Sequence, residues 1–169
     1  MVAITPEPEI VPLDPARDQA AAANVLAAAT GEGTVDQSKK LLAAARARGA
    51  TVFARIAGEE LLAVAVVRVE GLTAELDAIA VAPGYRGQGH GRACLEHALL
   101  LVGRRPLAVE TGESTLGFYR ACGFKLVGKR LRPDGTLRYR LAAHAKLPQA
   151  SSITLQRSQP VATSVDRPA

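Results

Sequence analysis

The stretch AELDAIAVAPGYRGQGHGRACL, residues 74–95, decides the fold, because it joins a strand-like segment to a helix-like one through a glycine-rich loop. Glycine lacks a Cβ atom, so its backbone N–H group approaches a ligand closely and its φ angle can be positive. The start of a helix adds unpaired N–H donors and a partial positive charge. The stretch therefore predicts an anion site, best suited to phosphate oxygens.

Two common phosphate motifs do not fit this loop. Residues 84–89 have the spacing of a Walker A loop, but His90 stands where its lysine is required. The third glycine of a dinucleotide fingerprint would fall on Arg92 or Cys94. What remains is the pattern Arg-x-x-Gly-x-Gly over residues 86–91. A tight turn with incidental glycines is the plainer alternative, but packing alone rarely needs so many glycines together.

The rest of the chain alternates between helical and strand-like patterns. Strands are expected at residues 9–14, 50–58, 60–71, 73–83, 105–111 and 124–131, and helices at 15–30, 34–49, 89–102 and 113–123. Residues 132–142 are expected to supply a Pro-Asp-Gly-Thr turn and a closing strand. This order predicts an α+β (mixed α/β) fold, with parallel strand pairing only around the helix at 89–102. We expect a single domain over residues 1–146, followed by a disordered, Ser/Pro/Gln-rich tail at 147–169.

Composition narrows the class of protein. Aromatic residues make up 4% of the chain and tryptophan is absent, which argues against nucleic-acid binding through base stacking. The basic residues between 120 and 146 fit a nucleic-acid patch, a phosphorylated ligand or a solvated face equally well. The longest apolar run, residues 61–67, is far below membrane-spanning length, and no leader pattern precedes it. We expect a cytoplasmic protein with no membrane partner and two free thiols, Cys94 and Cys122.

The stretch quoted above resembles the acetyl-CoA-binding motif of the GNAT superfamily of N-acetyltransferases. The sequence LGFYRACGFKLVG, residues 116–128, resembles the second signature of that family, and the resemblance covers about residues 9–142. It implies a central mixed, mostly antiparallel sheet of about six to seven strands flanked by about four helices. It also implies an acetyl-CoA-dependent N-acetyltransferase in which an acceptor amine attacks the thioester directly in a ternary complex. A catalytically weak GNAT-fold module that senses acyl-CoA is the alternative.

The resemblance also implies where the cofactor binds. The pyrophosphate would lie on the backbone N–H groups of residues 86–91, with Arg92 nearby, and the pantetheine arm would pair with residues 79–81 like an added strand. The expected cofactor-binding residues are Ile79, Ala80, Val81, Arg86, Gly87, Gln88, Gly89, His90, Gly91 and Arg92. Two positions depart from the family pattern: His90 replaces a branched aliphatic residue, and Gly112 replaces an asparagine that contacts the cofactor.

Acetyl transfer also needs an acid for the departing thiolate and a base for the amine. The resemblance gives Tyr119 the role of acid; the alternative is a core tyrosine packed beside Phe118 and Phe124. Glu75 is the expected base, and Asp77 shares its strand face, since side chains alternate along a strand. Solvated acids on an exposed face are the alternative reading, and Glu110 is a third candidate.

The sequence says less about a metal ion, the acceptor and the oligomeric state. His90, Cys94 and His97 share a helical face, but a metal site would need a further ligand, and we expect no metal cofactor. The acceptor stays open among small amines, amino acids, antibiotics, polyamines and proteins. A homodimer remains open as well, because family members often form one.

Overall fold

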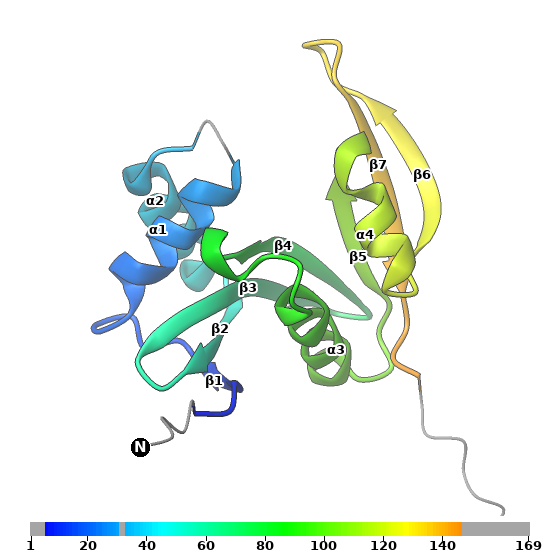
Figure 1. Ribbon diagram of the computed structural model, residues 1–169. Helices are drawn as coiled ribbons and strands as arrows, with labels where there is room; N and C mark the ends of the chain where they lie inside the picture. The colour runs from blue at the N-terminus through cyan, green and yellow to red at the C-terminus, as the bar shows by residue number, and fades with distance from the viewer. Residues whose placement is uncertain (1–5, 31–32, 147–169) are drawn as a thin grey trace, which may run out of the picture.

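A computed structural model describes residues 6–30 and 33–146 of the chain. The strands in these ranges are β1 (Glu9–Pro12), β2 (Thr51–Ala57), β3 (Glu60–Glu70), β4 (Thr73–Val81), β5 (Leu107–Thr111), β6 (Lys125–Leu131) and β7 (Leu137–Ala143). The helices are α1 (Gln19–Thr30), α2 (Val35–Ala47), α3 (His90–Val102) and α4 (Leu116–Ala121), with short 3-10 turns η1 (Pro83–Tyr85) and η2 (Glu113–Thr115) (Figure 1). The expected tail at 147–169 lies outside the described residues.

The seven strands of the described chain form one sheet in the order β1-β2-β3-β4-β5-β7-β6. Neighbouring strands are antiparallel except β4 and β5, which are parallel and are joined by the crossover helix α3. This confirms the expected mixed, mostly antiparallel sheet, with parallel pairing only around the helix that follows the glycine loop. None of the helices in the described ranges is long and apolar enough to cross a bilayer.

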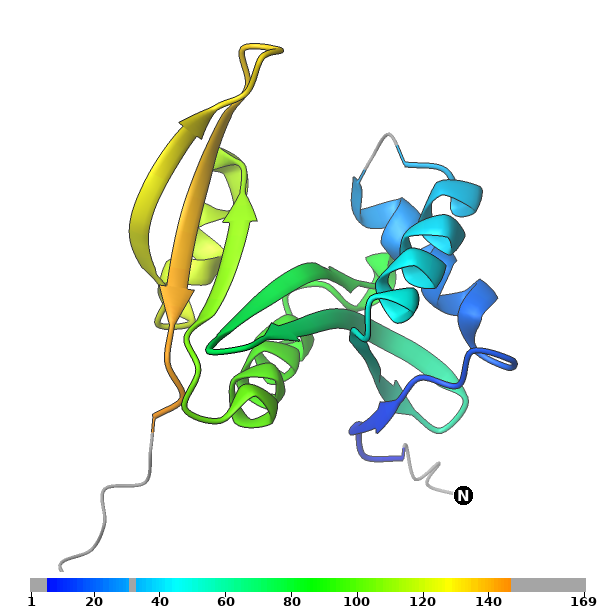
Figure 2. The same ribbon diagram turned by 180° about the vertical axis from the view of Figure 1, so that it is seen from behind.

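Helices cover both faces of the first half of the sheet. Strand β3 shows why: Ala63, Ala65 and Val67 pack into a core with α3, whereas Val64 and Val66 pack into a second core with α1 and α2. Alternate side chains of a strand point to opposite faces, so a strand apolar at every position needs a layer on each side. Figures 1 and 2 show α1 and α2 on one side of β2–β4 and α3 on the other.

The sheet opens between β4 and β5. Only two register pairs join these strands, Ala74 with Leu107 and Glu75 with Ala108. Beyond Glu75 the strands diverge, so that the α1/α2 side and the β5–β7 side of the molecule form the two arms of a V (Figures 1 and 2). The last part of β4 therefore has, on its β5 side, a backbone edge with no strand partner in the described chain.

The first helix begins later than the sequence predicts. Residues 15–18 form a turn, in which the backbone N–H of Ala16 donates to the Asp14 carboxylate (2.9 Å) and the N–H of Asp18 donates to the Asp14 carbonyl (2.9 Å). The Asp14 side chain thus offers the backbone a local alternative to the helix. The prediction that the helix starts at residue 15 was wrong by four residues.

Near the C-terminal end, one predicted helix differs from the structure, while the predicted turn and last strand agree with it. The expected helix at 113–123 consists of η2 followed by α4. The last strand starts at Leu137, after the predicted Pro-Asp-Gly-Thr turn. There the Arg132 N–H donates to the Thr136 carbonyl (2.8 Å), and Gly135 has a φ of +84°. The sequence pattern thus identifies the turn residues correctly.

Candidate functional site

A groove of about 550 Å³ opens at the mouth of the V, between the end of β4, the glycine loop and α4. Its lining residues are Ala29, Ile79, Ala80, Val81, Tyr85, Arg86, Gly87, Gly89, His90, Gly91, Arg92, Thr115, Phe118, Tyr119, Ala121 and Cys122. The fold thus brings the expected cofactor-binding residues, Gln88 excepted, to one groove together with Tyr119. The Gln88 side chain turns back instead, and its amide donates to the Gly84 carbonyl (3.4 Å).

The loop that leads into α3 depends on glycine at two positions. Gly87 has a φ of +75° and Gly89 a φ of +85°, in the left-handed region that side chains with a Cβ atom rarely adopt. Gly89 is also the N-cap of α3, and its carbonyl accepts the first helical hydrogen bond from Ala93 (3.0 Å). The helix therefore starts at the groove, with the unpaired N–H groups of its first turn beside it.

Gly91 is needed for a different reason. A Cβ atom at this position would lie 3.1 Å from Cζ of Phe118 and 3.4 Å from Cγ2 of Val81. Its backbone conformation is ordinary, so the constraint is the close approach of α3 to the Phe118 ring and the end of β4. The same glycine run thus combines a special backbone turn with tight helix packing.

Arg86 of the glycine loop and Arg92 of the first turn of α3 connect the walls of the groove. The Arg86 guanidinium donates to the carbonyls of Val81 (3.4 Å) and Ala28 (3.3 Å), so it ties the loop to β4 and α1. Arg92 donates to the Ala121 carbonyl at the end of α4 (2.7 Å). Both cations therefore stand at the mouth of α3, where they add positive charge to the N-terminal end of the helix.

His90 fills its unusual position as a buried, neutral ring. Only 8% of the residue is exposed, and its ring packs edge-on against Tyr85 with centroids 6.1 Å apart. Burial lowers the pKa of the imidazole, and the charge of Arg55 lowers it further. Nδ1 is buried without a hydrogen-bond partner among the described residues. The ring thus occupies the place of an aliphatic side chain at neutral pH.

Tyr119 belongs to both the core and the groove. It is 6% exposed, and its ring packs edge-on against Phe118 (5.1 Å between centroids) and Phe124 (5.6 Å). Burial raises the pKa of the phenol to about 12, with a further increase from Cys122 and a decrease from Arg138. A phenol with so high a pKa keeps its proton at neutral pH and can donate it toward a charge that develops in the groove.

Burial of Tyr119 and Cys94 predicts a loss of stability in alkali. Burial raises the pKa of the Cys94 thiol from its ordinary value of 9.0 to about 11, and that of the Tyr119 phenol from 10.0 to about 12. Above pH 9 the unfolded chain loses protons that the folded chain retains, so the free energy of unfolding falls as pH rises. We expect each group to cost about 2–3 kcal/mol by pH 12.

Chemical denaturation between pH 8 and 12 measures this loss. Cys94→Ala should flatten the fall between pH 9 and 11, and Tyr119→Phe should flatten it between pH 10 and 12. Slopes against pH are compared, because each substitution also changes packing. Slopes that match those of the unmodified protein would contradict the assignment.

The strand carboxylates Glu75 and Asp77 point away from the groove. Glu75 forms an ion pair with Arg140, and Asp77 accepts two hydrogen bonds from Arg68 (3.0 and 3.1 Å). Arg68 lies opposite Glu75 in the register and bonds to Asp77, so both carboxylates are on one face, as predicted. Both are paired with arginine, and none of the described residues that line the groove is acidic.

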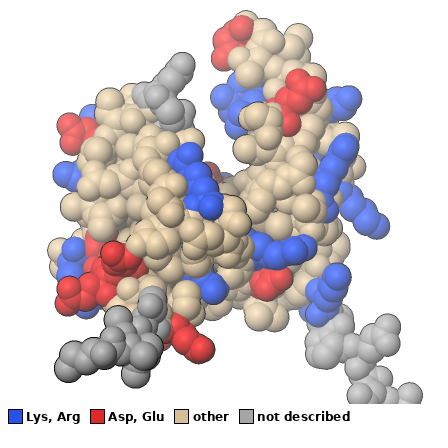
Figure 3. All heavy atoms as spheres, in the orientation of Figure 1, with Lys and Arg blue, Asp and Glu red and all other residues tan. Residues whose placement is uncertain are grey.

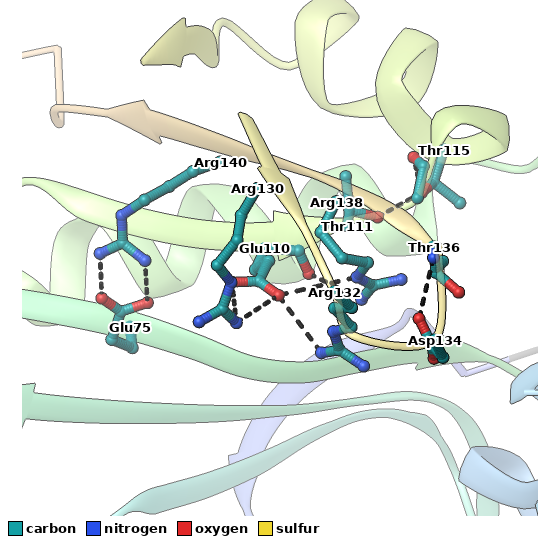
Figure 4. A network of polar contacts seen from close by, with 11 residues as sticks. Glu75, Glu110, Thr111, Thr115, Arg130, Arg132, Asp134, Thr136, Arg138 and Arg140 are labelled. Carbon is teal, nitrogen blue, oxygen red and sulfur yellow. Dashed lines mark hydrogen bonds and ion pairs between the residues drawn. The ribbon is translucent and has the colours of Figure 1, made fainter. Parts of the chain in front are cut away.

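Glu110 is held by three arginines (Figure 4). Arg130 donates to both carboxylate oxygens (3.0 Å each), Arg132 donates to one (3.2 Å), and the Arg138 guanidinium lies 3.7 Å away. Burial alone would raise the pKa of Glu110, but the hydrogen bonds from Arg130 and Arg132 outweigh it and lower the pKa. A carboxylate with a lowered pKa is a weak proton acceptor, which argues against Glu110 as the base.

The two histidines and the single cysteine of α3 serve packing. Cys94 is fully buried in the core, and the His97 ring packs edge-on against Phe53 at 4.7 Å between centroids. Cys94 and Cys122 are free thiols, as predicted. The described ranges contain no group of three His, Cys, Asp or Glu side chains placed to bind a metal ion.

Some residues of the site escaped sequence reasoning. Phe118 appeared only as a packing neighbour of Tyr119, yet it lines the groove and sets the approach of α3. Ala29 reaches the groove from α1, and nothing in an alanine-rich helix marks that position. The convergence of three arginines on Glu110 was also missed, although the excess of basic residues after position 120 was its signal.

Comparison with known proteins agrees with this geometry. The family model of the Acetyltransferase (GNAT) domain matches residues 39–126, which include the end of β4, the loop, α3 and α4. A peptidyl-lysine N-acetyltransferase, YjaB, of Salmonella typhimurium is 42% identical over 60 residues, 34% of this chain and 41% of that protein. Its Escherichia coli counterpart is 40% identical over 55 residues, 32% of this chain and 37% of that protein. The chain thus matches about two fifths of the length of these curated relatives.

Solved structures resemble the described fold over nearly their whole length. The ribosomal-protein-S18-alanine N-acetyltransferase of Escherichia coli has a TM-score of 0.70 and 25% identity, and the match covers 85% of this chain and 98% of that one. A GNAT family acetyltransferase of Elizabethkingia anophelis, solved with acetyl-CoA bound, has a TM-score of 0.64 and 21% identity. That match covers 81% of this chain and 97% of the other.

Proposed function

The chain belongs to the GNAT acetyltransferase family, and from that premise we propose that it transfers an acetyl group from acetyl-CoA to a lysine side chain of a protein. The observation that carries the proposal is the groove in which the glycine loop, the free edge of β4 and Tyr119 meet. Lysine is proposed as the acceptor because the matched relatives from Salmonella typhimurium and Escherichia coli are peptidyl-lysine N-acetyltransferases.

Acetyl-CoA would bind along the groove in two parts. Its pyrophosphate would accept hydrogen bonds from the backbone N–H groups of residues 86–91 at the positive end of α3. Its pantetheine arm would lie against residues 79–81 and pair with the free backbone edge of β4 as an added strand does. The side chains of Arg86 and Arg92, already bound to backbone carbonyls, would keep the walls of the site in place.

The transfer itself would follow from the position of Tyr119. The lysine amine attacks the thioester carbonyl carbon, and a C–N bond forms while the carbonyl oxygen takes up negative charge beside the backbone N–H groups near Val81. The C–S bond then breaks, and the phenol of Tyr119 gives its proton to the departing thiolate. The nitrogen gives up its proton to water and, through water, to Glu75, which lies outside the groove.

An acceptor screen tests the proposed function. Purified protein is mixed with acetyl-CoA and lysine peptides, polyamines or free amino acids, and released CoA thiol is measured. We expect thiol release with lysine peptides and formation of the N-acetyl product by mass spectrometry. Calorimetric binding of acetyl-CoA without turnover on any amine would instead favour an acyl-CoA sensor, and the absence of binding would refute both.

Glu75→Gln should change the pH dependence of turnover. If Glu75 receives the proton through water, its loss lowers kcat mainly below neutral pH, where hydroxide and buffer bases are scarce. We expect a several-fold decrease at pH 6 and little change at pH 8.5, measured by thiol release. Asp77→Asn is the matched control, since it also removes a strand carboxylate paired with an arginine. Equal profiles for the two variants and the unmodified enzyme would remove Glu75 from the mechanism.

A further inference from the structure

One face of the β5–β7 arm is bare and basic. Leu107 and Val109 of β5 pack into the core beside α3 and α4, as do Tyr139 and Leu141 of β7. The residues between them therefore point to the opposite face, which on this arm no helix of the described chain covers (Figure 2). This face carries the arginine cluster, defined as Arg130, Arg132, Arg138 and Arg140.

The cluster has more positive charge than its partners neutralise. Arg140 is matched by Glu75, but Arg130, Arg132 and Arg138 share the single carboxylate of Glu110. Asp134 of the β6–β7 turn, whose pKa the charge of Arg132 helps to lower, offsets one of the two remaining charges. One cationic charge of the cluster therefore remains without a nearby carboxylate in the described chain. The side chains of Arg130 and Arg132 are 66% and 45% exposed, so they are open to a ligand. A hollow of about 220 Å³, large enough for a carboxylate group, is lined by Arg130, Arg138 and Arg140 together with Gly128, Lys129 and Glu110.

The cluster lies close enough to Tyr119 for one of its charges to act on that residue. Arg138 donates to the backbone carbonyl of Glu110 (3.4 Å), and its Nη1 lies 3.6 Å from where a Cβ atom of Gly112 would be. Arg138 therefore lies against the end of β5, in the part of that strand that does not pair with β4. Burial raises the pKa of the Tyr119 phenol, and the charge of Arg138 acts against that increase. Figure 3 shows basic side chains on the side of this arm that faces the hollow of the V.

Cofactor phosphates are a poor match for this surface. The pyrophosphate site proposed above lies on the α3/α4 side of the sheet, whereas the cluster faces the opposite side. A ligand of the cluster would therefore approach Tyr119 from the side that acetyl-CoA leaves free. That is the direction open to an acceptor.

We propose that the arginine cluster binds acidic side chains that flank the acceptor lysine, so that the enzyme selects lysines in acidic segments of proteins. This inference rests on the proposed function and names its substrate class. The carboxylates that flank such a lysine would be attracted by the unpaired positive charge of the arginine cluster. Polyamines and lysines among other cations would be repelled by the same charge.

Peptide binding tests the inference without requiring turnover. Three fluorescent peptides with one central lysine, flanked by Glu, Gln or Arg, are titrated against the protein saturated with CoA, and anisotropy is measured. We expect the Glu peptide to bind about fivefold more tightly than the Gln peptide, and the Arg peptide to bind most weakly. Raising the salt from about 50 to about 300 mM should reduce the difference, since exposed charges are screened.

Variants locate the preference. The double variant R130Q/R132Q should lose most of the roughly two- to tenfold advantage that exposed ion pairs supply. R130E/R132E should reverse the order and favour the Arg peptide. Lys125→Gln is the matched control, because it removes an exposed cation from the same hairpin outside the cluster. It should leave the order unchanged.

Two results would overturn the inference while the proposed function stands. One is equal or weaker binding of the Glu peptide compared with the Gln peptide by a protein that binds acetyl-CoA. The other is an unchanged preference in R130E/R132E. Failure of the proposed function has a different signature, namely no binding of acetyl-CoA or no transfer to any lysine peptide.

Discussion

Replacement of Tyr119 by phenylalanine should lower kcat about 100-fold and leave the affinity for acetyl-CoA unchanged. General acid catalysis contributes typically 10²- to 10⁴-fold, and the hydroxyl is the part of Tyr119 that can protonate the thiolate. The ring, which packs between Phe118 and Phe124, is retained in the variant, so the core should be preserved. Thiol release under saturating substrates and calorimetry with acetyl-CoA measure the two quantities.

Tyr139→Phe is the control for this experiment. Tyr139 is the other tyrosine of the same core, also more than nine-tenths buried, but it does not line the groove. It should keep near-normal turnover. A Tyr119→Phe enzyme with full turnover would show that the thiolate leaves without help from this phenol, and Tyr119 would then be a packing residue only.

Gly89→Ala should weaken acetyl-CoA binding by about 10- to 100-fold. The φ of +85° at Gly89 places the loop N–H groups at the mouth of α3, and an alanine there costs on the order of 1–2 kcal/mol in the left-handed region. A loop that relaxes to negative φ turns its N–H groups away from the proposed pyrophosphate site, and a loop that does not relax presents a methyl group to the ligand. Calorimetric titration with acetyl-CoA gives the dissociation constant.

Gly135→Ala separates strain from ligand binding. Gly135 has nearly the same φ, +84°, and a Cβ atom there also meets open space, but it lies in the β6–β7 turn. Both variants should therefore lose similar thermal stability, while only Gly89→Ala loses affinity. Equal affinities in the two variants would show that the glycine loop does not hold the cofactor.

The sequence was sufficient for the fold because its local signals agree. The apolar strand patterns, the proline at position 83 and the glycines before α3 each predict the same strand, loop and helix that the structure contains. The boundaries that were wrong depend on competition between neighbouring hydrogen bonds. The Asp14 side chain holds residues 15–18 in a turn, which helix propensity alone does not reveal.

The sequence predicted residues of the candidate site only where those residues lie together in one continuous segment. Residues 86–92, in the loop and the start of α3, and Tyr119 come from two continuous motifs, and most of them line the groove. The ionic partners of the carboxylates come from distant parts of the chain: Arg140 meets Glu75 across 65 positions, and Arg130 meets Glu110 across 20. These ion pairs depend on the strand register and on the strand order β5-β7-β6, and the hydrophobic pattern of the sequence predicts neither.

Because only two register pairs join β4 and β5, the two halves of the sheet share a narrow junction. A pantetheine arm on the free edge of β4 would form backbone hydrogen bonds that no strand of the described chain forms there. It would also fix the distance between the two halves of the sheet. Backbone amides at residues 79–81 should then exchange with deuterium more slowly in the loaded protein, while those of β2, two strands away, keep their rate. Binding of acetyl-CoA would thus strengthen the narrow junction between β4 and β5, and release of CoA would loosen it again.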